Sequence, residues 1–404
     1  MTVVGALRQR SFAWLWTGQA ISRLGDSIHR VALSWWVLEQ TGSAAVMGTV
    51  LIFSFTPMLL FLLIGGVAGD RLPRVRLMLG SDLLRGGVVA LVAALAATHT
   101  LQIWHLYVAS MVFGLLDAFF QPAYTALVPE ITPAPLLPSA NSLTSLSGQL
   151  SNIAGPAIGA GIVAAGGTAL AFAVDSLSFF LSAACLIPLI GLPQAPAPAG
   201  HGARHMLRDL REGVRAVLAA PWLWVTIALA ALFNITQGGP LAVALPFLVK
   251  DSLHADVGVL GLLYSMTSVG AVLSAIWLGR ARRIRRRGLL AYLGLLAGGL
   301  TTLMLGLPVP LPAVAVVILL NGAAVTVFGL IWTNTLQELV PRDLLGRVAS
   351  IDMLGSFALL PIGYGIAGWA TDLLGPALVF ITGGALTCAL VLIGLAHPGI
   401  RNLD

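Results

Sequence analysis

Long apolar stretches alternate with short polar ones along the whole chain. An α-helix needs about 20 mostly apolar residues to cross the hydrocarbon core of a bilayer. Because the stretches are long and lack the strict alternation of barrel strands, they predict an all-α integral membrane protein. The pattern predicts twelve transmembrane helices, over residues 12–38, 45–68, 76–97, 103–128, 140–164, 168–191, 222–249, 257–279, 288–307, 312–336, 347–371 and 376–396.

The basic residues gather on one side of the predicted membrane. With the N-terminus in the cytoplasm, 18 of the 22 Lys and Arg residues lie in cytoplasmic loops or tails, and the outer loops hold only Lys250. Arg23, Arg30 and Arg85 lie within spans. Cytoplasmic loops of membrane proteins are enriched in Lys and Arg. The distribution therefore predicts cytoplasmic termini, and it explains the net charge of +6 without a nucleic-acid partner.

Composition supports the membrane class and argues against catalysis. The chain is 58% hydrophobic and 9% charged, whereas soluble domains carry about 25% charged residues. The single lysine, Lys250, is not part of a phosphate-binding Gly-Lys-Ser/Thr loop. No His/Cys group has the spacing of metal ligands. We therefore expect a protein that is not an enzyme and that uses no metal or cofactor.

The longest polar break lies at residues 192–221. After a Pro/Ala-rich stretch, apolar residues at helical spacing lie opposite Arg208, Arg211 and Arg215. This arrangement predicts an amphipathic helix on the inner membrane surface.

Six predicted spans lie on each side of this linker. Leu127-Val-Pro129 precedes the fifth span, and Leu339-Val-Pro341 precedes the eleventh, which is a weak internal repeat. We predict two pseudo-symmetric six-helix bundles, over residues 1–191 and 222–404, joined by the cytoplasmic linker. Repeated halves favour a substrate site near the bilayer midplane between them.

The first span is unusually polar. Gln19, Arg23, Asp26 and Arg30 share one helical face. A charge at the bilayer centre costs at least about 2.5–3.5 kcal/mol, so such groups pair or face water. Asp26 and Arg30 are four residues apart and can pair. The face is either part of a cavity, with Asp26 as a proton or cation site, or an internal salt bridge that holds helices together.

A second polar group lies around spans 2 to 4. Four of its members belong to the charged stretch Gly66–Arg74, which runs from the end of the second span toward the third, and the others lie within the third and fourth spans. We expect one charge network that closes the cytoplasmic side, in which Asp117 is either a gate residue or a transport residue. The set is Gly66, Asp70, Arg71, Arg74, Asp82, Arg85 and Asp117.

These patterns resemble signatures of the major facilitator superfamily. The loop Gly66–Arg74 has the family's spacing of Gly, three residues, Asp-Arg, two residues and Arg. Gly155, Pro156 and Gly159 resemble its helix-5 antiporter motif, which occurs mostly in exporters, although Ala160 replaces the second Gly. Strings such as Ser81-Asp-Leu-Leu-Arg85 are similar to the bacterial branch of macrolide-efflux and enterobactin-exporter proteins.

The resemblance implies that helices 1, 4, 7 and 10 line a central cavity. It also implies that Asp70 caps the helix that begins near Arg347, in the other half. Many proton-coupled exporters carry an Arg early in helix 4, and this chain has none there. We expect the substrate to contact Asn234, Gln237, Asn321, Tyr124 and Gln121.

The sequence thus predicts a secondary exporter in the bacterial inner membrane. We expect a monomer that moves a hydrophobic or amphipathic small molecule, of drug or siderophore type, outward by alternating access and proton influx. Its partners would be this small molecule, protons and membrane lipids. Two alternatives stay open. One is a lipid or lysolipid flippase, and the other is a non-transporting membrane receptor or scaffold.

Overall fold

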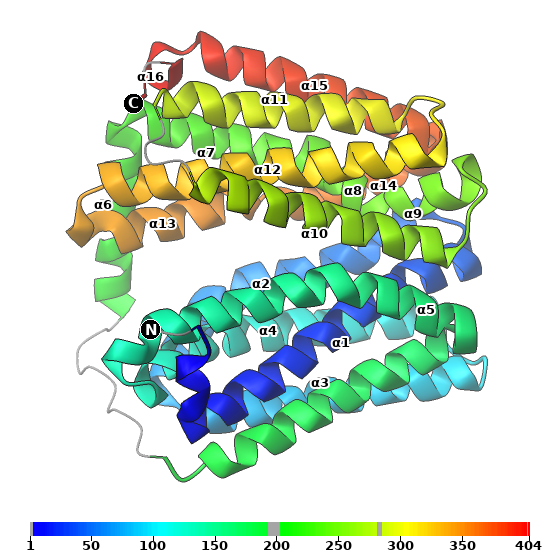
Figure 1. Ribbon diagram of the computed structural model, residues 1–404, viewed down its shortest axis with the longest axis vertical. Helices are drawn as coiled ribbons and strands as arrows, with labels where there is room; N and C mark the ends of the chain where they lie inside the picture. The colour runs from blue at the N-terminus through cyan, green and yellow to red at the C-terminus, as the bar shows by residue number, and fades with distance from the viewer. Residues whose placement is uncertain (1–2, 193–202, 281–284, 402) are drawn as a thin grey trace. The chain divides into compact units, whose positions relative to one another are not determined.

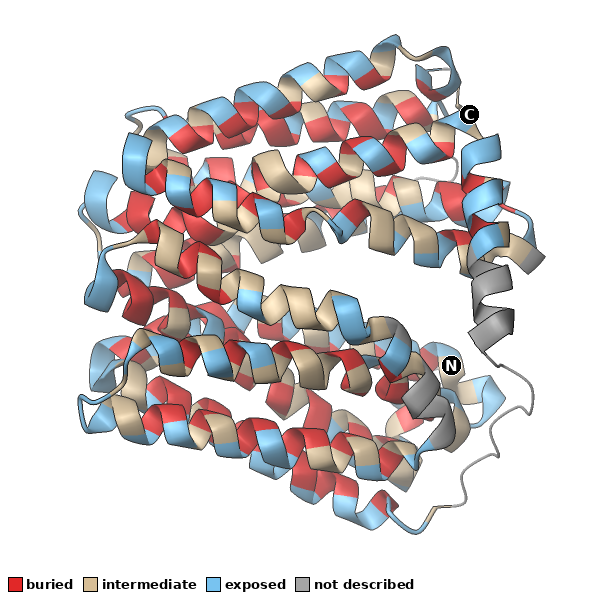
Figure 2. Cartoon of the chain, turned by 180° about the vertical axis from the view of Figure 1, so that it is seen from behind, coloured by how far each residue is buried: buried red, intermediate tan, exposed pale blue. Residues whose placement is uncertain are grey.

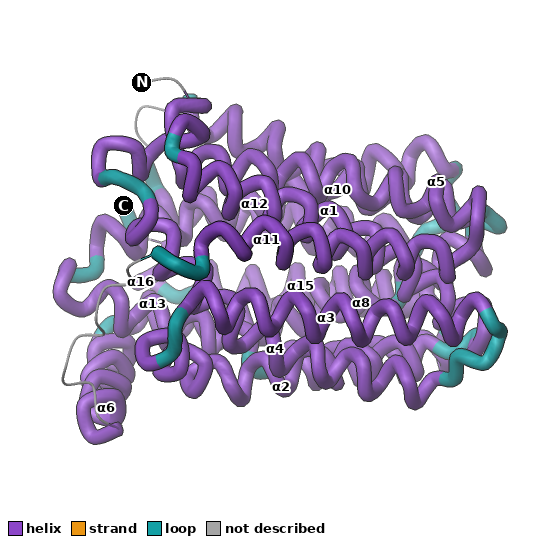
Figure 3. The backbone as a smooth tube through the Cα atoms, turned by 90° about the horizontal axis from the view of Figure 1, so that it is seen from below, coloured by secondary structure: helices purple, strands orange, loops and turns teal. Residues whose placement is uncertain are grey.

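The computed structural model describes residues 3–192, 203–280, 285–401 and 403–404, including all side chains there except those of residues 3, 63, 67–71, 203–210 and 343. Within these ranges the chain consists of helices and connecting loops, without a strand (Figure 3). Ten of the described helices are long and apolar enough to cross a membrane. The predicted all-α membrane fold is therefore confirmed.

The chain divides into two compact units. Unit 1 comprises Met1–Gly42, Thr49–Pro198 and Asp256–Ser265, and unit 2 comprises Ser43–Gly48, Ala199–Ala255 and Met266–Asp404. In both, buried residues gather on the helix faces that meet neighbouring helices (Figure 2). Large apolar side chains such as Leu60, Trp369 and Ile393 are exposed, as expected for helices in contact with lipid tails.

Unit 1 contains η1 (Val3–Arg8), α1 (Arg10–Thr41), most of α2 (Ala44–Arg71), α3 (Arg74–Ala97), α4 (Ile103–Ile131), η2 (Ala134–Leu136), α5 (Leu137–Leu186) and η3 (Ile187–Leu189). Helix α5 covers the predicted span 140–164 and residues 168–186 of the predicted span 168–191, which continues into η3. Its backbone leaves the helical region at Gly166 and Gly167, and φ of +74° at Gly167 suits a residue without a Cβ. This break separates α5 into two spans.

Close packing of α1 against α5 forms the centre of unit 1. A Cβ at Gly159 would lie 2.9 Å from the Ile28 Cα, and one at Gly155 would overlap the Ser27 side chain. Small residues let membrane helices approach this closely. Two residues of the antiporter-like pattern therefore lie directly against α1, and Pro156, between them, is buried.

Unit 2 contains α6 (Ala203–Ala219), α7 (Pro221–Phe233), η4 (Asn234–Gly238), α8 (Gly239–Val243), α9 (Leu245–Phe247), η5 (Leu248–Ser252), the second part of α10 (Val257–Gly279), α11 (Arg287–Leu305), α12 (Leu311–Leu339), α13 (Arg342–Phe357), α14 (Leu360–Leu374), α15 (Pro376–Ala396) and α16 (Pro398–Arg401). The predicted span 222–249 is a series of short segments, two of them π-helices. Pro240 and Pro246 contribute to this because proline cannot donate a backbone hydrogen bond.

Helix packing in unit 2 positions its interior site. Helices α11, α12 and α15 run close together (Figure 1), and α6 packs on α13 through Val217 and Val348. Arg347 Nη1 lies 2.6 Å from Glu212 Oε2 across the same pair of helices. Helix α6 therefore forms where the amphipathic helix was predicted, and its place on a membrane surface stays a prediction.

The start of α2 belongs to unit 2, where Asp372 of α14 caps it. The Asp372 carboxylate accepts hydrogen bonds from the backbone N–H groups of Ala44 (2.6 Å) and Ala45 (3.1 Å). It also accepts one from the Ser43 hydroxyl, at 2.6 Å. A carboxylate at this position satisfies free N–H groups and is favoured by the helix dipole.

Candidate functional site

Unit 1 buries an acid–imidazole pair. His29 Nδ1 of α1 lies 2.8 Å from Asp175 Oδ2 of α5, and Asp175 is completely buried. The imidazole packs against Phe113 and Phe172, with ring centroids 5.6 and 5.2 Å away. His29 also borders a cavity of about 100 Å³. Local spacing offers His29 no partner because 146 positions separate it from Asp175, and only the packing of α1 on α5 joins them.

A second set of charges, of which Asp82 and Arg85 are buried and Asp117 is partly exposed, is centred on Arg85 of α3. Arg85 Nη2 lies 3.3 Å from Asp117 Oδ1 of α4, and the guanidinium sits 4.5 Å from the centre of the Phe120 ring. Asp82 accepts a hydrogen bond of 2.7 Å from Ser182, which in turn accepts one of 3.2 Å from the Gln19 amide. Ion pairing and hydrogen bonds are what make buried charge tolerable in an apolar interior.

Asp26 lies next to both sets. The charged groups that act on it are Asp175, Arg85, Asp117 and His29. Within the described ranges no direct ion pair joins Asp26 to Arg30, which is exposed. The possible i, i+4 pair is thus not formed, and the charged groups that act on Asp26 lie on α1, α3, α4 and α5. We name the group Asp26, His29, Asp82, Arg85, Asp117 and Asp175 the charged cluster.

The other residues of unit 1 that were predicted to line the cavity or contact the substrate make contacts outside the charged cluster. Arg23 donates to the Thr144 carbonyl at 3.1 Å, and its guanidinium lies 5.5 Å from the centre of the Tyr124 ring. The Tyr124 hydroxyl shares a hydrogen bond of 3.3 Å with the Thr144 hydroxyl. Arg23 and Tyr124 thus connect α1, α4 and α5. Gln121 is exposed on α4, where its carbonyl accepts a hydrogen bond from Thr125.

The predicted gate network is divided between two places. Arg74, at the start of α3, pairs with Glu130, near the end of α4, whereas Arg85 pairs with Asp117 in the charged cluster. Glu130 was missed as a gate residue because 56 positions separate it from Arg74. Gly66 lies in α2, and the side chains of Asp70 and Arg71 lie outside the described residues, so the expected Asp70 cap stays a prediction.

Unit 2 encloses a larger cavity, of about 400 Å³. Its wall is mostly aromatic and aliphatic, with contributions from α7, η4, α8, α11, α12 and α13. Asn234 and Gln237, two predicted substrate contacts, both line it. They belong to the π-helix η4, and single-turn π segments inside α-helices occur often at functional sites.

The polar groups of this cavity are few and definite. Asp352 of α13 accepts hydrogen bonds from the Trp332 indole (3.1 Å) and the Ser356 hydroxyl (3.4 Å). Asn234 donates to the Ser356 carbonyl at 2.8 Å. Gln237 is 5% exposed, and its amide nitrogen has no hydrogen-bond partner. Local spacing in the sequence does not single out Asp352, since nothing local marks it as facing a cavity.

Asn321 occupies a different position. It is buried between α11 and α12 and is not among the described residues that line the cavity. Its amide nitrogen lies 3.1 Å from the Gly298 carbonyl and 3.0 Å from each of the hydroxyls of Thr301 and Thr302. Asn321 therefore joins two helices, and it does not reach the cavity in this structure.

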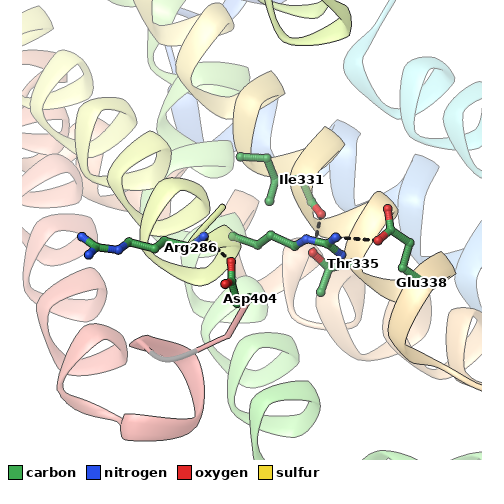
Figure 4. A network of polar contacts seen from close by, with 6 residues as sticks. Arg286, Ile331, Thr335, Glu338 and Asp404 are labelled. Atoms are coloured by element: carbon green, nitrogen blue, oxygen red, sulfur yellow. Dashed lines mark hydrogen bonds and ion pairs between the residues drawn. The ribbon is translucent and has the colours of Figure 1, made fainter. Parts of the chain in front are cut away.

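A further polar network lies at the ends of α11 and α12 (Figure 4). The Arg286 backbone N–H donates to Asp404 at 2.6 Å, and Arg287 pairs with Glu338 at 2.5 Å. The first contact fastens Asp404 to the start of α11, the second joins α11 to α12, and both lie outside the wall of the large cavity.

Two units of membrane-crossing helices, one with a charged interior and one with an apolar cavity, define a membrane transporter of the major facilitator superfamily. The family model described as transmembrane secretion effector matches residues 1–399. The chain belongs to this family, whose members are transporters and not enzymes.

The relatives agree with this assignment. The chain is 22% identical over 396 residues to macrolide efflux protein A of Streptococcus pyogenes, with 97% of each chain covered. It is 29% identical over 349 residues to the enterobactin exporter EntS of Shigella boydii serotype 4, with 84% of this chain and 80% of the exporter covered. These proteins make a transporter of the efflux type the best-supported class and favour it over a receptor or scaffold.

Solved structures show the same fold. A POT family transporter in complex with 5-aminolevulinic acid superimposes with a TM-score of 0.75 at 13% identity, covering 96% of each chain. A bacterial homologue of the iron transporter ferroportin in an inward-facing state gives a TM-score of 0.73 at 15% identity, covering 96% of this chain and 99% of the homologue. At such identities the likeness concerns the fold alone.

Proposed function

We propose that the protein is a secondary active transporter that exports a hydrophobic or amphipathic small molecule in exchange for protons. The observation that carries the substrate part is the cavity in unit 2. Its volume of about 400 Å³ falls in the range of roughly 300–1,000 Å³ typical of small-molecule sites, which are mostly apolar with a few placed polar groups. Macrolide efflux protein A and the enterobactin exporter also take small molecules as substrates.

The charged cluster of unit 1 supports the proton part. Four carboxylates, those of Asp26, Asp82, Asp117 and Asp175, accompany one guanidinium and one imidazole. The surplus of acidic groups gives the cluster the capacity to hold a proton inside a membrane protein, where ionisable residues are expensive and usually functional. In the proposed cycle, a proton enters on Asp26 and reduces its repulsion with Asp117 and Asp175.

We further propose that the protein lies in a bacterial inner membrane with both termini in the cytoplasm. Its two units would expose the substrate site alternately to the two sides of this membrane. The arginine distribution supports this orientation. Proton binding and release would favour different access states, so that proton influx drives export.

Transport by the purified full chain in proteoliposomes tests the proposal. A labelled macrolide and labelled enterobactin serve as probes, and uptake is followed with and without an imposed pH gradient. We expect at least one probe to accumulate against its own gradient only when the pH gradient is present. Accumulation that ignores the pH gradient would contradict proton coupling, and no transport of either probe by protein of native thermal stability would contradict the substrate class.

The variant Asp26→Asn tests the coupling residue. We expect it to abolish gradient-driven accumulation and to leave probe binding unchanged. Asp251→Asn is the matched control because Asp251 is exposed in η5 of unit 2. Full gradient-driven transport by Asp26→Asn removes Asp26 from the proposed coupling step.

A further inference from the structure

We propose that the cavity of unit 2 selects amphipathic cations and that Asp352 and Trp332 determine this selectivity. This inference rests on the proposed function, which makes the cavity a substrate site. It goes beyond that function because neither the apolar wall nor the relatives' names fix the charge of the substrate.

The wall of the unit 2 cavity carries a negative charge. Among the described residues that line the cavity, Asp352 is the one with a charged side chain. Each of its oxygens accepts one hydrogen bond, from Trp332 and from Ser356. A carboxylate offers about four acceptor positions. Asp352 is thus held in place by the wall and keeps the capacity to accept hydrogen bonds from, or pair with, a cationic group in the cavity.

An aromatic surface lies beside the Asp352 carboxylate. The rings of Trp332 and Phe328 are stacked, with centroids 6.4 Å apart and planes 8° apart, and both line the cavity together with Phe233. The face of an aromatic ring attracts a cation, most strongly for Trp. Because the Trp332 indole N–H donates to Asp352, one residue both orients the carboxylate and supplies an aromatic face near it.

The same cavity disfavours anionic and neutral ligands. An anion of the same size would lie near the Asp352 carboxylate, and no described lining residue supplies a positive charge to offset the repulsion. A neutral molecule would gain the apolar contacts but would leave the carboxylate unpaired. Charge complementarity therefore gives specificity for a cation over its neutral and anionic counterparts.

Two probes of nearly equal shape and opposite charge test the inference. Binding of tetraphenylphosphonium and of tetraphenylborate to the purified full chain is measured by equilibrium dialysis at one pH and one salt concentration. We expect tetraphenylphosphonium to bind more tightly. Asp352→Asn should weaken its binding by about 10- to 100-fold and should leave or improve the binding of tetraphenylborate. Asp352→Glu should recover part of the loss, and Asp251→Asn should change neither probe.

Gly329→Leu separates failure of this inference from failure of the proposed substrate site. Gly329 lines the cavity, and a Cβ built there meets no atom within 4 Å, so the leucine side chain can occupy the cavity without displacing the helix. Gly87→Leu is the control, at an exposed helix position in unit 1 with equal free space. If Gly329→Leu blocks both probes and Asp352→Asn leaves tetraphenylphosphonium binding unchanged, the cavity is the site and the charge selectivity is wrong. If Gly329→Leu changes neither probe, the cavity is not the site.

Discussion

The two units bury different chemistry. In the part of the chain that the structure describes, the three buried charged side chains, Asp82, Arg85 and Asp175, all lie in unit 1. Unit 2 buries amides and hydroxyls and encloses a cavity of about 400 Å³, against about 100 Å³ beside His29 in unit 1. The two units, each predicted to have six spans, therefore differ in the chemistry of their interiors.

The difference has a physical cause. Buried charges require close partners, so the helices around Arg85 and Asp175 must approach each other and leave little free volume. The glycine contacts between α1 and α5 supply this approach. The cavity of unit 2 has a mostly aromatic and aliphatic wall with few polar groups, and the Gln237 amide nitrogen there has no hydrogen-bond partner. Under the proposed function, proton binding and the binding of a bulky molecule would be assigned to different units.

Among the variants that test the difference between the two interiors, we expect removal of Arg85 to have the largest effect, a loss of stability in unit 1. Arg85→Ala removes the cation that pairs with Asp117 and that also acts on the buried Asp82 carboxylate. Loss of one partner of a fully buried ion pair destabilises by about 3–5 kcal/mol, and the partial exposure of Asp117 makes the expected loss smaller than this. Thermal unfolding of the purified protein in detergent measures this. Arg30→Ala, at an exposed position of α1, should unfold near the wild-type temperature. Equal unfolding temperatures for the two variants would show that the charged cluster does not stabilise unit 1.

Enlarging a glycine of α5 tests the close approach itself. Gly159→Leu places side-chain atoms against the Ile28 backbone of α1, and overpacking of this kind costs about 1–3 kcal/mol. The control is Gly161→Leu, because a Cβ at Gly161 meets nothing within 4 Å. We expect lower thermal stability for the first variant only. A stable Gly159→Leu protein would indicate that α1 and α5 separate easily.

Asp175→Asn tests whether the interiors of the two units act independently in function. It keeps the size of the side chain but removes the charge that faces His29, so proton-driven export should fall by at least about tenfold. Tetraphenylphosphonium binding in unit 2 should stay within about twofold of wild type. Transport and dialysis on the same preparation measure both. Loss of binding together with transport would show that the two interiors are not independent.

The smallest expected effect concerns the cap that Asp372 provides in unit 2. Asp372→Ala removes the acceptor for Ala44, Ala45 and Ser43, and loss of such a cap costs about 1 kcal/mol. Asp372→Asn should retain much of the stability because asparagine is also a good N-cap. Thermal unfolding distinguishes the two, and equal values for the Ala and Asn variants would mean that the cap contributes little.

The apolar pattern predicted the helices well because membrane thickness sets their length. The break at Gly166 and Gly167 falls between two predicted spans, and α13 and α14 meet just before Pro361, a proline that lies inside a single predicted span. The series of short segments over 221–252 was not predicted, because π-helical turns depend on packing and leave no clear pattern in apolar spacing.

The sites were harder to predict, and the reason is pairing over long sequence distances. The family resemblance, which implies that the seventh helix lines a cavity, led to Asn234 and Gln237 as substrate contacts, and both line the cavity of unit 2. By contrast, the partners of Arg74 and His29 lie on other helices, and the side chain of Asp352 faces a cavity that exists only in the folded unit. Local spacing therefore suggested Arg30 as a partner for Asp26, whereas the fold surrounds Asp26 with more distant charges.

Gly329 gives the cavity an evolutionary property. Because a Cβ added there meets no neighbouring atom within 4 Å, single-codon changes to residues such as Ala or Val can reduce the available volume in graded steps. Under the proposed function, in which the cavity of unit 2 binds the substrate, selection could thus adjust the range of exported molecules through this one position without changing unit 1.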